Sequence, residues 1–176
     1  MNVIKLPVRH YKQGTDDYAC GPFCIRMSID YLLMRDGKPK SDHGAIKMIE
    51  HLTMNGKLRF SSGTPPGRMI NTIQRMGFGC REIRGYSDDT RLRNLRRAID
   101  HRNPVILGCL ADLGGKRYRH YVVLIGIDDK YIYIRDPYPE GRPPNVRINK
   151  FLKNGNPTSW GNKRWGIEIC INSNKQ

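Results

Sequence analysis

The chain has 176 residues, enough for one domain with a hydrophobic core and too few for two comfortable ones. Aromatic residues occur throughout, which excludes wholesale disorder, and no run of about 18 apolar residues is present, which excludes a membrane-spanning helix. Lys and Arg number 31 against 16 Asp and Glu, so the formal net charge of +15 favours an acidic partner, either nucleic acid, an anionic membrane surface or an acidic protein.

Helical periodicity in the first part of the chain predicts four helices, at 21–35, 41–54, 65–76 and 89–102. In the third, Thr64 is expected to be the cap, Pro65 the first residue and Gly77 the C-cap. The fourth contains the densest basic patch, Arg91–Arg97, which we interpret as a solvated helix face. We expect its apolar residues to face inward, and these are Leu92, Leu95 and Ile99.

After Pro104 the pattern changes to short apolar runs, which predict strands at 105–110, 121–127, 131–134 and 165–171. A turn at 128–129 joins the second and third strands as a hairpin, and a helical turn is expected at 149–152. Helices followed by an antiparallel sheet indicate an α+β fold. We expect one domain over residues 1–176, with a helical part at about 10–103 and a sheet part at about 104–172.

The five cysteines favour reduced thiols, because their number is odd and no secretory signal precedes them. No Cys-x-x-Cys pair occurs, so we expect no structural zinc, and nothing else in the sequence indicates a metal or a cofactor. Four of the cysteines are interpreted as small buried apolar residues, and these are Cys24, Cys80, Cys109 and Cys170.

Cys20 is the exception, because a loop ends at this residue and a helix starts directly behind it. A helix N-terminus carries partial positive charge and unsatisfied N–H groups, and both stabilise a thiolate. The sequence therefore predicts that Cys20 is a nucleophile. Gly21 allows a close turn, and Pro22 has no N–H to leave unpaired in the first helical turn.

A cysteine nucleophile needs a base, and His120 is the best placed because it opens a buried strand. His10, which precedes the cysteine loop, and the remaining histidines do not have this position. Asp136 ends the next strand, so a hairpin around 128–129 would make His120 and Asp136 cross-strand neighbours. A carboxylate there would fix the imidazole tautomer and support its positive charge.

These motifs resemble the bacteriocin-processing, double-glycine peptidase family of papain-like cysteine proteases over about residues 10–171. The matching residues, in order, are Gln13, Cys20-Gly21-Pro22, His120-Tyr121-Val122-Val123-Leu124 and Asp136-Pro137. The resemblance implies a papain-like fold in a stand-alone form. It implies that Cys20 is the nucleophile, His120 the base and then the acid, and Asp136 the orienting group.

Gln13 resembles the family's oxyanion-hole glutamine, but the sequence departs from the family here in two respects. Gln13 lies seven residues before Cys20, one more than is usual, and Ala19 stands where an acidic residue is common. A bulged loop would absorb the additional residue.

The expected reaction is cleavage of a peptide bond in a peptide or protein substrate, and the net positive charge favours an acidic one. The same triad would also serve a glutamine deamidase or a transglutaminase, for instance a bacterial effector or toxin, because all three form an acyl-enzyme. A binding module without catalysis, directed at nucleic acid or an acidic protein, is the other hypothesis. Because no apolar stretch of a secretory signal opens the chain, we expect a cytoplasmic protein or one exported without a classical signal peptide.

Overall fold

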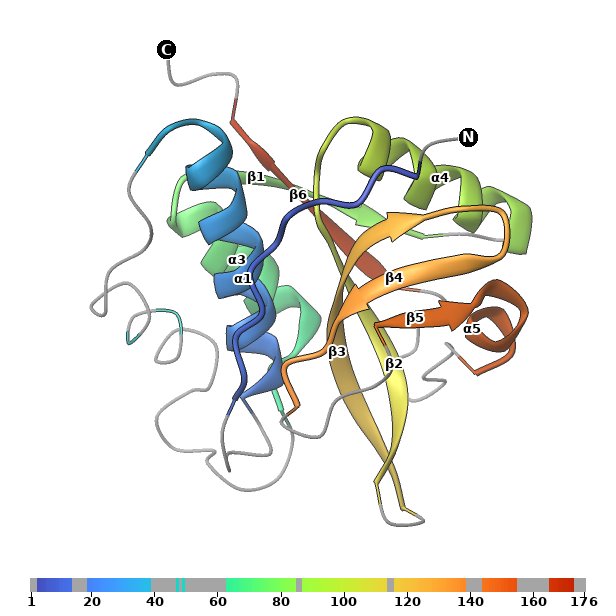
Figure 1. Ribbon diagram of the computed structural model, residues 1–176. Coiled ribbons are helices and arrows are strands. Elements are labelled where there is room, and N and C mark those ends of the chain that lie inside the picture. Colours follow the sequence, from blue (N-terminus) through green and yellow to red (C-terminus); the bar gives the residue numbers. More distant parts are fainter. Residues whose placement is uncertain are drawn as a thin grey trace.

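The computed structural model describes residues 3–13, 19–38, 47, 49, 63–84, 87–113, 116–138, 144–154 and 165–172. Of the helix expected at 41–54, only Lys47 and Ile49 belong to the described residues, and both are helical. Figure 1 shows α1 and α3 next to each other on one side of a twisted sheet, with α4 and α5 on the other side. Within the described ranges, no helix combines the length and the apolar character that a membrane span needs.

The helix α1 (Cys20–Arg35) forms the centre of the helical side. Most of its residues are buried, including Cys24, Ile25, Met27 and Ile29, because it packs on α3 and on the sheet. A helix that is apolar on nearly all sides is typical of a core element. It begins at Cys20 itself, one residue earlier than the periodicity predicted.

The helix α3 (Pro66–Arg75) lies beside α1 and starts one residue later than expected. Pro65 occupies the N-cap position with extended backbone, so Thr64 lies outside the helix instead of capping it. Gly77 has a φ of 87°, the left-handed conformation in which helices commonly end.

The helix α4 (Asp88–Asp100) is capped by Ser87, whose hydroxyl accepts a hydrogen bond from the Thr90 N–H at 3.2 Å. The prediction of a fully solvated basic face is wrong for Arg91, which is buried with its guanidinium 4.3 Å from the centre of the Phe151 ring. Phe151 belongs to α5 (Ile148–Asn154). Arg91 therefore faces inward, because the Phe151 ring offers its guanidinium a favourable surface. Leu92, which was expected to face inward, is only partly buried.

Among the described residues, the sheet has six antiparallel strands in the order β1-β6-β2-β3-β4-β5, which confirms the α+β fold. The strands are β1 (Phe78–Ile83), β2 (Val105–Leu113), β3 (Lys116–Ile127), β4 (Tyr131–Arg135), β5 (Asn145–Arg147) and β6 (Gly166–Ile171). β2 and β3 are longer than predicted. β1 lies inside the part expected to be helical and pairs with the C-terminal β6, which no local pattern indicated.

β3 and β4 form the predicted hairpin around residues 128–129, but with a bulge. Near the turn, Gly126 pairs with Tyr133, whereas Leu124 pairs with Ile134. Ile125 is therefore an additional residue in β3, and the register beyond it is shifted by one.

The N-terminal segment (residues 3–13) crosses the sheet at this bulge and runs toward the start of α1 (Figure 1). Lys5 forms an isolated bridge with Gly126, and the Leu6 N–H donates to the Ile125 carbonyl oxygen at 2.7 Å. Further along, Arg135 Nε donates to the Val8 carbonyl oxygen at 3.2 Å. The N-terminal segment is thus held against both strands of the hairpin.

Candidate active site

Cys20 is the first residue of α1 and is only 4% exposed. The first intrahelical hydrogen bond runs from the Phe23 N–H to the Ala19 carbonyl oxygen at 3.0 Å, so the N–H groups of Cys20 and Gly21, which precede it, have no helical acceptor. No acidic residue occupies this first turn. The Cys20 sulfur therefore lies in the positive field of the helix N-terminus.

Gly21 allows another segment to approach the start of α1. A Cβ at this position would lie 3.0 Å from the side chain of Thr64, the residue that precedes α3 by two positions. Thr64 is fully buried, and its main-chain oxygen accepts a hydrogen bond from the Tyr121 hydroxyl at 2.8 Å. The start of α1 is thereby packed against the entry of α3 and the strand that carries His120.

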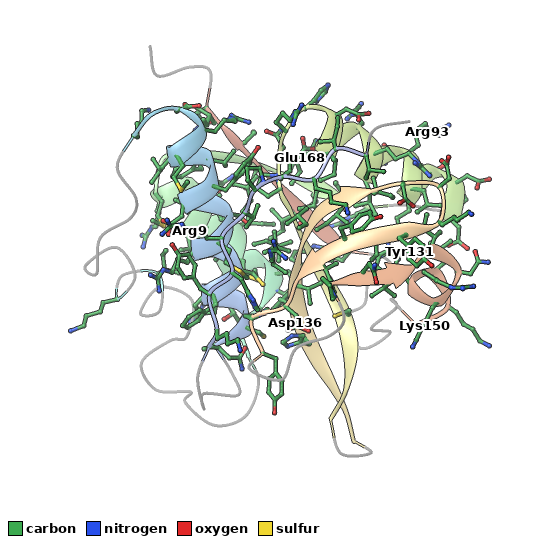
Figure 2. The ribbon with its side chains drawn as sticks, viewed as in Figure 1. Arg9, Arg93, Tyr131, Asp136, Lys150 and Glu168 are labelled. Atoms are coloured by element: carbon green, nitrogen blue, oxygen red, sulfur yellow. The ribbon has the colours of Figure 1, made fainter. Side chains whose placement is uncertain are left out.

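His120 and Asp136 form a hydrogen-bonded pair, with Nε2 of His120 2.6 Å from Oδ1 of Asp136. Each residue is 5% exposed. The same carboxylate oxygen accepts the Tyr138 N–H at 2.9 Å, and the Tyr138 ring stands edge-on to the imidazole at 6.4 Å. Figure 2 shows Asp136 just beyond β4, beside the end of α1 at which Cys20 lies.

The pKa of His120 reflects burial and two partners. Burial alone would lower it, but the hydrogen bonds to Asp136 and Cys20 raise it from 6.5 to about 9. Nε2 of His120 is engaged by Asp136, which leaves Nδ1 as the ring nitrogen available to Cys20. An imidazole with this pKa is protonated at neutral pH, so its positive charge lies close to Cys20. The three residues are therefore brought together as expected.

Gln13 is buried near this pair. Its main-chain N–H donates to the Pro137 carbonyl oxygen at 2.8 Å, which places Gln13 beside the residue that follows Asp136. The bulged loop expected between Gln13 and Ala19 lies outside the described residues. The fold thus places Gln13 close to Asp136, and its role as an oxyanion-hole donor stays a prediction.

His10, which lacks the strand position expected of a base, contacts the site. Its Nε2 lies 2.5 Å from the main-chain oxygen of Asp136, across a sequence separation of 126 residues. No sequence periodicity reports so distant a contact. The nearest signal is the proximity of His10 to Gln13 in the chain.

The remaining cysteines divide into two groups. Cys24 and Cys109 are buried, and Cys24 lies close enough to Cys20 and Asp136 for their charges to act on its thiol. Burial is the largest cause that raises the pKa of Cys24 well above its usual value. Cys80 and Cys170 are only half-buried, which corrects the expectation that they are core residues. Within the described ranges, no three His, Cys, Asp or Glu side chains cluster in a way that could hold a metal ion.

Comparison with known proteins identifies a family. Residues 5–164 match the model of the "Peptidase_C39 like family". No curated protein sequence matches the chain.

Solved structures resemble the fold over nearly the whole chain. A C39-like peptidase from Bacillus anthracis is 16% identical, with a TM-score of 0.67 over 98% of this chain and 100% of that one. The peptidase domain of Streptococcus ComA, described as a bifunctional ABC transporter, is 20% identical, with a TM-score of 0.62 over 94% and 99% of the two chains. A double glycine motif protease from an AMS/PCAT transporter, solved with its leader peptide, is 14% identical, with a TM-score of 0.62 over 98% and 99%. At these identities the likeness shows a shared fold.

Proposed function

Since the chain belongs to the Peptidase_C39 like family of cysteine peptidases, we propose that it cleaves a peptide bond with Cys20, His120 and Asp136 as its catalytic triad. The observation that carries this proposal is the arrangement of three residues, with Asp136 hydrogen-bonded to His120 and Cys20 close enough to His120 to raise the pKa of the imidazole. All three are buried, and Cys20 lies at a helix N-terminus that favours a thiolate.

The reaction would proceed by acyl transfer. The Cys20 thiolate attacks the substrate carbonyl carbon, and the resulting oxyanion collapses as the bond to nitrogen breaks. His120, which starts as the imidazolium, gives its proton to the leaving amine. Water, deprotonated by the now neutral His120, then attacks the thioester and releases the acid product. Proton transfer of this kind supplies about 10²–10⁴-fold of the rate.

The oxyanion needs hydrogen-bond donors, and we assign this role to the side-chain amide of Gln13 and the main-chain N–H of Cys20. Support comes from the position of Gln13, which is buried and hydrogen-bonded through its main chain to Pro137, next to Asp136. Removal of one such donor typically costs about 3–4 kcal/mol of transition-state stabilisation.

We further propose that the substrate is a peptide with two glycines before the scissile bond. One structural neighbour is described as a double glycine motif protease in complex with a leader peptide. Cys20 and His120 are each about one-twentieth exposed, so a backbone without side chains would reach the sulfur most readily.

The test uses synthetic peptides that contain either Gly-Gly or Val-Val at one position, with products identified by mass spectrometry. We expect wild-type protein to cleave after Gly-Gly and Cys20→Ala to lose at least about 10³-fold of this activity. Cys24→Ala is the matched control, since it removes a neighbouring buried thiol and should retain the activity. Retained cleavage by Cys20→Ala, or conversion of glutamine to glutamate without cleavage, would reject the proposal.

A further inference from the structure

We propose that His10 is a positioning residue of this peptidase, whose hydrogen bond to the main-chain oxygen of Asp136 holds the carboxylate in line with His120. This inference rests on the proposed function and assigns a role to a side chain outside the triad.

The contact with Asp136 determines which ring nitrogen of His10 carries a proton. A carbonyl oxygen can only accept hydrogen bonds, so Nε2 of His10 must carry the proton in the 2.5 Å contact with Asp136. His120 and the Tyr138 N–H therefore hold Asp136 by its side chain, and His10 holds it by its main chain.

The strand ladder does not restrain the backbone of Asp136. Arg135 is the last residue of β4 paired with β3, so Asp136 lies beyond the ladder. The next residue, Pro137, has no N–H to donate. A shift of the Asp136 main chain would move the carboxylate with it, and small displacements of a catalytic group can cost about 10²-fold in rate.

The N-terminal segment supplies a fixed support for His10. It is bonded to β3 through Leu6, to β4 through Val8, and to the Asp136 loop through Gln13, whose N–H donates to the Pro137 carbonyl oxygen at 2.8 Å. His10 lies between the last two of these anchors. The N-terminal segment thus positions the Asp136 carboxylate through His10 and also carries Gln13, the proposed oxyanion donor.

The test measures alkylation of Cys20 by iodoacetamide as a function of pH, with the modified cysteine identified by peptide mapping. This probe needs no substrate. The rate should change where His120 loses its proton, near pH 9 in the wild type. In His10→Ala the carboxylate supports the imidazolium less well, so this inflection should fall by about half a pH unit or more, the equivalent of one net hydrogen bond.

Two conservative variants separate positioning from a structural effect. The side-chain amide of His10→Gln reaches about as far as Nε2 and should restore the inflection. The amide of His10→Asn reaches only as far as Nδ1 and should behave like alanine. His101→Ala, which changes an exposed histidine at the end of α4, should match the wild type.

The outcomes are distinct. Wild-type inflections in both His10→Ala and His10→Asn would overturn the inference, as would equal rescue by Asn and Gln. If wild-type Cys20 is alkylated no faster than the half-buried Cys80 and Cys170, the nucleophile assignment fails, and the role of His10 falls with it.

Discussion

His120 and Asp136 point toward each other because β3 contains one more residue than β4 between their turn and the site. The register near the turn, Gly126 with Tyr133, would continue to place Asp136 opposite Val123. Residues at odd spacing along a strand point to opposite faces, so Asp136 would then face away from His120. The bulge at Ile125 shifts the register by one, so the pairing of Val123 with Arg135, continued by one residue, brings Asp136 opposite Val122 and onto the face of His120.

The first prediction concerns the pH dependence of the wild-type peptidase. The pKa of His120 is raised to about 9, so its protonated form persists well above the ordinary value of 6.5. In the proposed mechanism the imidazolium protonates the leaving amine, so activity should hold from neutral pH to about 9 and decline above it. A pH profile of kcat/KM checks this, and an alkaline limb near pH 6.5 would contradict it.

The second prediction is that Asp136→Asn lowers kcat/KM at neutral pH by about 10²–10⁴-fold. The amide keeps the shape but removes the charge that supports the imidazolium, so the pKa of His120 should fall and the alkaline limb should move to lower pH. Asp129→Asn changes an exposed carboxylate at the turn and serves as the control. If the alkaline limb of the kcat/KM profile lies at the same pH in Asp136→Asn as in the wild type, the carboxylate does not act on His120.

The third prediction is that Gly126→Ala lowers the free energy of unfolding by about 1–3 kcal/mol. A Cβ there would lie 2.7 Å from the main-chain oxygen of Ile4, and a backbone atom cannot move aside as a flexible side chain can. The N-terminal segment would be displaced, together with His10 and Gln13, so activity should fall as well. Urea unfolding and a peptide assay measure the two effects.

Gly67→Ala is the control for this change. Gly67 lies on α3, and a Cβ at that position meets no atom within 4 Å. Alanine there should stabilise the helix by about 0.5–1 kcal/mol. Equal stability of Gly126→Ala and the wild type would mean that the N-terminal segment does not depend on the close approach at Gly126.

The fourth prediction is that Thr64→Val raises the free energy of unfolding by about 1 kcal/mol. Thr64 is fully buried, and its hydroxyl has no hydrogen-bond partner in the part of the chain that the structure describes. Valine removes this polar group at similar size and keeps the main-chain oxygen that Tyr121 contacts. Denaturant unfolding measures the change.

Thr72→Val provides the comparison, because its buried hydroxyl donates to the Arg68 carbonyl oxygen at 2.9 Å. We expect this variant to gain no stability. A loss of stability in Thr64→Val as large as in Thr72→Val would show that the Thr64 hydroxyl is satisfied in solution.

The local elements of the fold could be predicted from the sequence, because their signals lie within a few residues. The helix behind Cys20, the left-handed Gly77 after α3 and the hairpin around 128–129 are of this kind. β1 was missed because its partner is the last strand of the chain. The inward position of Arg91 was missed because it depends on the ring of Phe151, sixty residues away.

The sequence by itself determined which chemical groups are available: a cysteine at a helix start, a histidine on a strand and an aspartate after the next strand. The periodicity of apolar residues indicates which segments are helices and strands, so the positions of these three residues at the ends of such segments follow from the sequence. Only the tertiary structure decided that Asp136 faces His120 and that His10 holds its main chain, because strand register and contacts over 126 residues depend on packing between distant segments. One bulged residue changes the face on which a side chain lies, and no local pattern marks that residue.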